Sequence, residues 1–230
     1  MIDILKKKAL LLDMNNTFMF GEDRFGESEN FYLQYSKTGG KLSPSEVNGI
    51  IRSTYNNLTL KYADEKYREN FPSLNSAMHE VADGKVADSD IENLIETFAF
   101  HELGHIPHKY VEILHLLSRN FVLAAVIDIW APKRPWLQEF EKVGVLDLFT
   151  SISFSSDHGK VKPSPEPFEM VINQINIAKP DVMYIGDSVR RDLGGATNAG
   201  IDCILVGGEN HPNAIANYSN LIELYEQIFK

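Results

Sequence analysis

The sequence has little of several features that define large classes of proteins. Its 230 residues include one cysteine, Cys203, so no disulfide can form within the chain and a thiolate metal cluster is excluded. Basic residues are outnumbered, 22 against 32 acidic ones, and the net charge of −10 repels nucleic acid and anionic membranes. The N-terminal stretch MIDILKKKALLLDMN matches neither a signal peptide nor a membrane span. We therefore expect a cytoplasmic protein that binds neither nucleic acid nor membrane.

Short apolar segments indicate buried parallel strands. Four stand out, at 9–13, 121–128, 182–187 and 202–207, and a weaker candidate covers 148–156. Helical patterns alternate with them; in one, Tyr110, Ile113, Leu114 and Leu117 share a face at helical spacing. Apolar residues make up 43% of the chain, which is enough for a sizeable core. The sequence therefore predicts an α/β fold built on a parallel sheet.

A long insertion separates the first two strand candidates. More than a hundred residues lie between them, whereas a βαβ unit needs only about 30. Inside this stretch Ser43, Pro44 and Glu46 form a capping-box helix start, and Ser89 is expected to begin a second helix. We therefore predict a mainly helical cap at 19–104, inserted into a core made of 1–18 and 105–230.

The stretch HELGHIPH carries the H-E-x-x-H spacing of zinc proteases, in His101, Glu102 and His105. That site needs both histidines on one face of an uninterrupted helix. Gly104 is typical of a helix C-cap and Pro107 of the first turn of the next helix, so the break is predicted between the histidines. The downstream third histidine of metzincins is also missing. We interpret the stretch as the return connection from cap to core.

Three strand candidates end in an aspartate: Asp13, Asp128 and Asp187. In an open α/β sheet, ligands bind beyond the carboxyl ends of the strands. We therefore expect these acids to converge on one crevice.

Further polar residues accompany these strand ends. Thr17 follows the first strand, and Asp192 lies five residues after Asp187. Lys162 lies in a proline-rich turn, with Lys160 as the competing candidate. A carboxylate can attack phosphorus to form an aspartyl-phosphate, while clustered carboxylates need a cation such as Mg²⁺. The set therefore indicates phosphoryl transfer.

These motifs, in this order, resemble the haloacid dehalogenase (HAD) superfamily, whose members are mostly Mg²⁺-dependent phosphatases with a Rossmann-like core and a helical cap. The resemblance implies that Asp13 is the nucleophile and Lys162 its partner lysine. It implies Mg²⁺ as cofactor and a small phosphorylated molecule as substrate. Ser188 is either a phosphate contact or a helix N-cap. The metal ligands that the resemblance implies are Asp13, the main-chain carbonyl of Asn15, Asp187 and Asp192, the last supporting either the metal or the lysine.

The chain departs from this family pattern at two places. Asn15 stands where phosphatases of the family carry an aspartate that acts as general acid and base, and Asn16 replaces the usual glycine. An amide cannot transfer a proton at neutral pH. At the end of the second strand, Ile127 stands where a Ser or Thr would hold the phosphate, and it is followed by Asp128, which either has a role in the site or caps the strand.

Three functions remain open at this point. The first is a Mg²⁺-dependent phosphohydrolase with weakened acid and base catalysis, and the second is a phospholigand-binding or regulatory protein with little turnover. The third is a dehalogenase, a branch of the family that lacks the acid at the position of Asn15 but also lacks the metal-binding signature. Arg24, Tyr32 and Tyr35 of the predicted cap are candidates to read the substrate. The sequence does not distinguish a monomer from a homodimer.

Overall fold

The computed structural model describes residues 4–229 and contains a six-stranded sheet in which every pairing is parallel. The strand order is β3-β2-β1-β4-β5-β6. The four strong strand predictions and the weaker one at 148–156 are confirmed, whereas the short β6 at the sheet edge was not predicted. The strands are β1 Ala9–Leu12, β2 Val122–Ile127, β3 Phe149–Phe154, β4 Val182–Gly186, β5 Asp202–Leu205 and β6 Ala216–Asn217.

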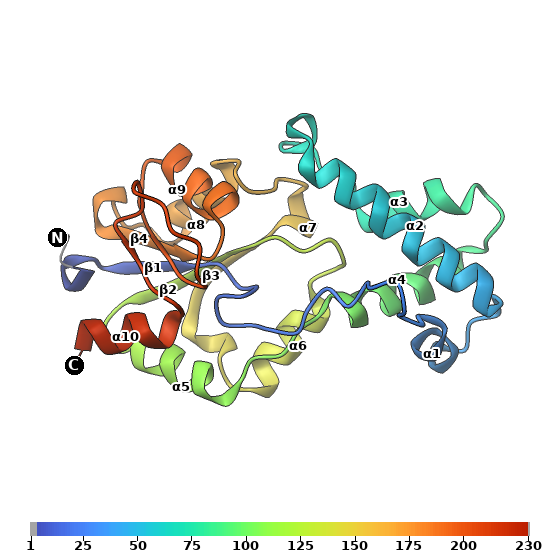
Figure 1. The fold of residues 1–230 in the computed structure, drawn as a ribbon, viewed down its shortest axis with the longest axis horizontal. Coiled ribbons are helices and arrows are strands. Elements are labelled where there is room, and N and C mark those ends of the chain that lie inside the picture. The colour runs from blue at the N-terminus through green and yellow to red at the C-terminus, as the bar shows by residue number, and fades with distance from the viewer. Residues whose placement is uncertain (1–3, 230) are drawn as a thin grey trace.

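Helices cover both faces of this sheet (Figure 1), which explains why all of β1 is apolar. Leu10 and Leu12 belong to one hydrophobic cluster, with α5 (His108–Leu117), α6 (Arg134–Lys142) and α10 (Leu221–Phe229). Leu11 belongs to the other cluster, with α8 (Glu166–Ile175) and α9 (Gly194–Ala199). The predicted apolar face of α5 is confirmed, since Ile113, Leu114 and Leu117 are buried. The predicted α/β class is therefore confirmed.

The long insertion between β1 and β2 is helical. It contains α1 (Tyr32–Tyr35), α2 (Pro44–Ala63), α3 (Leu74–Ala82) and α4 (Asp88–Glu102), which lie to one side of the sheet in Figure 1. The predicted capping box of α2 is present, with Ser43 and Glu46 bonded to each other's main chain. The predicted start of α4 at Ser89 is wrong, because Ala87 is the N-cap and the helix already begins at Asp88. No helix among residues 4–229 is long and apolar enough to cross a membrane.

The two connections between the insertion and the sheet run side by side. Phe20 and His105 form an antiparallel bridge, with main-chain hydrogen bonds of 2.9 Å in both directions. The helix break between His101 and His105 is confirmed. Leu103, not Gly104, is the C-cap of α4, and Pro107 is the N-cap of α5 and not a residue of its first turn. Gly104 is required for another reason, since a Cβ there would lie 2.7 Å from the carbonyl oxygen of Phe20. The predicted limits of the cap, residues 19 and 104, stay predictions, and the pairing of Phe20 with His105 supports them.

Candidate active site

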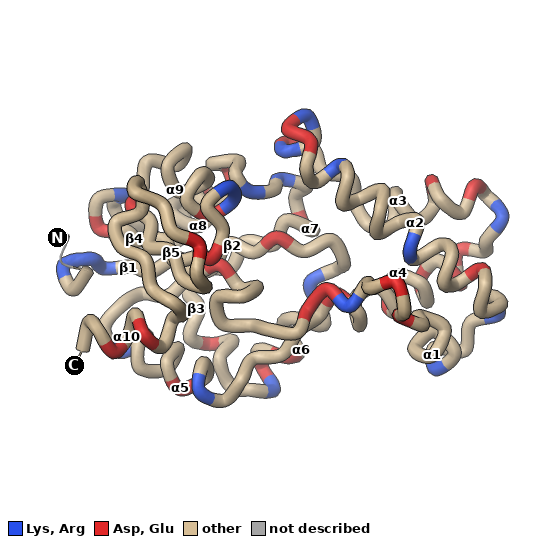
Figure 2. The backbone as a smooth tube through the Cα atoms, in the orientation of Figure 1, with Lys and Arg blue, Asp and Glu red and all other residues tan. Residues whose placement is uncertain are grey.

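The candidate site lies at the switch point of the sheet. From β1 the sheet grows through β2 and then β3 on one side, whereas β4 pairs with the other side of β1. Asp13 follows β1 directly and Asp187 follows β4, so both carboxylates lie at the carboxyl ends of adjacent strands. Figure 2 shows acidic segments at the strand ends on the side that faces the inserted helices. Open α/β sheets bind ligands at such a crevice.

Three aspartates converge there. One carboxylate oxygen each of Asp13, Asp187 and Asp192 lie within 4.8 Å of one another. Asp192 is 0% exposed, and its side chain packs against Gly186, where a Cβ would lie 2.4 Å from the Asp192 carboxyl carbon. Asp187 Oδ1 is buried without a hydrogen-bond partner. Hard carboxylate oxygens with an unmet charge are a fitting donor set for Mg²⁺.

Lys162 is the cation of this cluster. Its Nζ donates to Asp13 Oδ1, to Asp192 Oδ1 at 2.7 Å and to the Tyr184 hydroxyl at 3.2 Å, and its side chain is 3% exposed. Lys160, the competing candidate, instead forms ion pairs with Glu69 and Glu166 at 3.7 and 3.0 Å. The geometry therefore favours Lys162 as the lysine of the site.

Burial and charge set the protonation of these groups. Burial, with a further contribution from Asp192 and Asp187, raises the pKa of Asp13 to about 7 against the attraction of Lys162. Burial and the charge of Asp192 raise the pKa of Asp187 to about 6. Although burial opposes it, the contact with Lys162 keeps the pKa of Asp192 below its usual value. A divalent cation among the three acids would favour their ionised forms.

The turn after β1 places the other predicted residues. Thr17 is buried, and its hydroxyl lies 3.4 Å from Asp13 Oδ2. The side-chain oxygen of Asn15 is buried without a partner. Asn16 has φ 55°, a left-handed conformation that asparagine adopts more readily than most residues. Its presence where the family usually has glycine is thereby explained.

Ser188 has a local structural contact. Its Oγ accepts a hydrogen bond from Arg191 N at 3.3 Å, as the N-cap of the helical turn Val189–Leu193. Its main-chain N–H donates to Asp192 Oδ2 at 2.9 Å. The geometry supports the helix-start interpretation, and the substrate-binding role of Ser188 stays a prediction.

The end of β2 differs from the family pattern as expected. Ile127 is 1% exposed and belongs to the apolar core. Asp128 instead faces polar partners: its Oδ2 accepts from the Tyr62 hydroxyl at 2.6 Å and from the Lys162 main-chain N–H at 2.9 Å. A residue of the helical insertion thus reaches the sheet edge at which the candidate site lies.

Sequence reasoning missed two residues of this site. Tyr62, in the last turn of α2, carries no sequence signal because its position depends on how the insertion packs. Arg191 lies beside the motif acids, with its guanidinium 3.9 Å from Asp187 Oδ1 and 5.9 Å from the centre of the Tyr62 ring. Its position directly before Asp192 in the sequence could have identified it, since a cation there lies close to the same carboxylates as Lys162.

The H-E-x-x-H residues do not form a metal site. His101 is 3% exposed inside the cap, and Glu102 accepts from the main-chain N–H groups of Trp130 and Ala131 at 2.6 and 2.9 Å. Within the part of the chain that the structure describes, the one group of acids, histidines or cysteines that could hold a metal is the aspartate triad. Glu102 ties the end of α4 to the loop after β2, which agrees with a connecting role.

The residues proposed to read the substrate from the cap have internal partners. Arg24 donates to the carbonyls of Gly21, Leu103 and Phe100. Tyr35 is fully buried and donates to Asp90. These contacts fasten the insertion and weaken the case for substrate contact by Arg24 and Tyr35.

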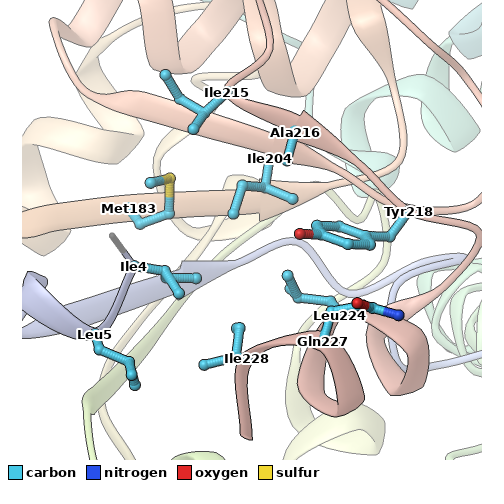
Figure 3. Close-up of a pocket in the computed structure, with 10 residues that line it drawn as sticks. All are labelled: Ile4, Leu5, Met183, Ile204, Ile215, Ala216, Tyr218, Leu224, Gln227 and Ile228. Atoms are coloured by element: carbon cyan, nitrogen blue, oxygen red, sulfur yellow. The ribbon is translucent and has the colours of Figure 1, made fainter. Parts of the chain in front are cut away.

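A separate hydrophobic cavity of about 300 Å³ lies between α10 and strands β4–β6 (Figure 3). Its lining includes Met183, Ile204, Leu224 and Ile228, and no carboxylate or lysine. The charged groups of the candidate site therefore lie outside this cavity.

This fold and this acidic site define a hydrolase of the HAD class. The chain belongs to the haloacid dehalogenase-like hydrolase family, whose model matches residues 11–206.

Relatives and solved structures agree with that assignment. The chain is 27% identical over 124 residues to the pyrophosphatase PpaX of Halalkalibacterium halodurans, a match that covers 51% of this chain and 56% of that protein. The chain thus spans about half the length of the curated relatives it matches. A HAD phosphatase from Thermococcus onnurineus has a TM-score of 0.64 at 20% identity, over 96% of this chain and 98% of that one. The HAD-hydrolase YfnB of Bacillus subtilis, bound to magnesium, has a TM-score of 0.61 at 18% identity, over 97% and 99%. These two structures show the shared fold.

Proposed function

We propose that the protein is a Mg²⁺-dependent phosphohydrolase of a small phosphorylated metabolite. The observation that carries the proposal is the convergence of Asp13, Asp187 and Asp192 around one point, with Lys162 bonded to two of them. Dehalogenation attacks carbon and needs no cation, so it would leave Asp187 and Asp192 without a metal to hold. The pyrophosphatase and phosphatase names of the relatives support phosphorus as the reacting centre.

Asp13 would act as the nucleophile. Its carboxylate attacks phosphorus, the bond to the leaving oxygen breaks, and water then hydrolyses the aspartyl-phosphate. Lys162 holds the attacking carboxylate in place and offsets its charge as the phosphoryl group approaches. Asp13, Asp187, Asp192 and the main-chain carbonyl of Asn15 would hold Mg²⁺, which neutralises charge on the phosphoryl oxygens.

Asn15 limits the reaction. Its amide cannot give a proton to the leaving oxygen or take one from water, and such help is worth about 10²- to 10⁴-fold. Either the leaving group departs without a proton, as acyl and aryl phosphates do, or another residue supplies the proton.

The experiment is a hydrolysis screen of acyl, aryl and sugar phosphates with Mg²⁺ or with a chelator. We expect turnover that requires Mg²⁺ and is lost in Asp13→Asn, while Asp147→Asn keeps full activity, because Asp147 is exposed and lies just before the amino end of β3. If no ester is hydrolysed, or if the chelator has no effect, the proposal is wrong.

A second candidate is a phospholigand-binding protein with little turnover. It is favoured by two observations, the unpartnered side-chain oxygen of Asn15 and the apolar Ile127 where a phosphate-holding hydroxyl is expected. Tight binding of a phosphate ester without turnover would support it, and rapid hydrolysis by Asn15→Asp would then show that the remaining machinery is intact.

A further inference from the structure

The carboxyl group of Asp128 has an asymmetric set of partners. Both of its donors, the Tyr62 hydroxyl and the Lys162 main-chain N–H, point to Oδ2, at 2.6 and 2.9 Å. Oδ1 is buried and has no hydrogen-bond partner. An oxygen that already accepts two donors is a poor place for a proton, so a proton on this carboxyl group resides on Oδ1. The free oxygen is therefore the one that can give or take a proton.

The surroundings of Asp128 raise its pKa on balance. Burial raises the pKa of Asp128, while Lys162, Tyr62 and Arg191 act in the opposite direction. Burial and the charge of Asp128 hold the pKa of Tyr62 well above its usual value, so the phenol stays protonated and remains a donor. A carboxyl group with a raised pKa holds a proton more readily than a free aspartate, as a general acid must.

Asp128 also lies at the junction between the helical insertion and the sheet. It follows β2, the neighbour of β1, and joins the main chain of Lys162 to a residue of the helical insertion. The same end of the insertion docks on the loop before Lys162, because Phe71 N donates to Gly159 O at 2.7 Å and Val161 N to Arg68 O at 3.0 Å. The part of a substrate that points away from Asp13 would enter this junction between insertion and sheet.

Other buried acids near the junction are less suitable. Both oxygens of Glu102 are occupied by main-chain N–H groups. Glu22 Oε2 is unpartnered, but it lies 3.2 Å from the Cβ position of Gly104, in the paired connections to the insertion. Asp128 alone among these three is bonded to the segment that carries Lys162.

We propose that Asp128 is the general acid and base that replaces the missing carboxyl group at Asn15, and that Tyr62 positions it. The inference rests on the proposed phosphohydrolase function. In the first step Asp13 attacks phosphorus, the bond to the leaving oxygen breaks, and the Asp128 Oδ1 proton passes to that oxygen, which leaves as an alcohol. In the second step water attacks phosphorus, the bond to Asp13 breaks, and the water proton returns to Asp128 Oδ1. Ester and water become alcohol and phosphate.

The test compares leaving groups that do and do not need a proton. Wild type, Asp128→Asn and the control Asp147→Asn are assayed on glycerol phosphate and on dinitrophenyl phosphate with Mg²⁺. We expect wild type and control to hydrolyse both, and Asp128→Asn to lose about 10²- to 10⁴-fold in kcat on glycerol phosphate only. Equal losses on both esters, or no loss on either, would overturn the proposal.

Two further variants separate chemistry from folding. Asn15→Asp in the Asp128→Asn background restores an acid in the loop after β1, and we expect it to recover turnover of glycerol phosphate. If Asp128→Asn had only damaged the fold, this second substitution would not restore activity. Tyr62→Phe should lower kcat on glycerol phosphate with little change in KM. Failure of both results contradicts the proposal. Wild type that hydrolyses only the dinitrophenyl ester overturns this proposal alone, whereas wild type inactive on both esters overturns the phosphohydrolase function as well.

Discussion

Replacing Lys162 by methionine tests how the acidic cluster is held together. The lysine side chain is 3% exposed and is bonded to Asp13 and Asp192, which are 6% and 0% exposed. Methionine fills most of the volume but leaves both carboxylates without their cation. Removing one partner of a buried ion pair costs about 3–5 kcal/mol. We expect a loss of this size in the free energy of unfolding near neutral pH without Mg²⁺, measured by urea denaturation.

Two comparisons make this prediction sharp. Lys160→Met, two residues away, removes only partly exposed ion pairs with Glu69 and Glu166 and should shift the unfolding midpoint far less. The loss in Lys162→Met should shrink in acid, because the unpaired carboxyl groups can then take up protons instead of remaining charged. The reasoning is refuted if the two lysine variants are equally stable, or if the loss does not depend on pH.

Three further predictions concern Mg²⁺ binding, Gly186 and the contact between Glu102 and the loop after β2. Burial raises the pKa of Asp13 to about 7 and that of Asp187 to about 6, so the folded metal-free protein binds protons that the unfolded chain has released. Its thermal stability should therefore fall as the pH rises from about 4 to about 7, and Mg²⁺ should flatten this slope in melting curves; a slope unchanged by Mg²⁺ would contradict the assigned site. Gly186→Ala places a Cβ 2.4 Å from the Asp192 carboxyl carbon, and the overpacking should cost about 1–3 kcal/mol and weaken Mg²⁺ binding in calorimetry. Glu102→Ala leaves two main-chain N–H groups without their acceptor. A loss below about 1 kcal/mol in the free energy of unfolding would show that this contact does not stabilise the fold.

Much of the core could be predicted because its signals are local. The apolar run at Ala9–Leu12 is buried on both faces of the sheet, and its strand could be recognised without knowledge of its neighbours. The capping box at Ser43 is equally local, since all its partners lie within one helical turn. Position after a strand also predicted the convergence of Asp13 and Asp187, because parallel strands deliver their ends to one edge.

What failed depended on packing between distant segments. Ser89 was expected to cap α4, but the N-cap is Ala87, two residues earlier, and Asp88 and Asp90 lie in the first turn, where acids are favourable. Glu102 looked like part of a zinc motif, and its contact with the loop after β2 became visible only in three dimensions. The same holds for Tyr62, whose partner Asp128 is 66 residues away in the chain.

The two departures from the family pattern can be understood as one change. Asn15 removes a carboxyl group on one side of the reacting centre, and the position after Ile127 introduces another carboxyl group, Asp128, on the neighbouring strand. An additional ionised carboxylate there would repel a phosphate, but a carboxyl group that carries its proton on Oδ1 does not. The Tyr62 hydroxyl and the Lys162 N–H both bind Oδ2 and thereby favour that arrangement. Because Tyr62 belongs to the insertion, the acid would be correctly oriented only while the insertion is docked on the sheet, which couples proton transfer to a closed site.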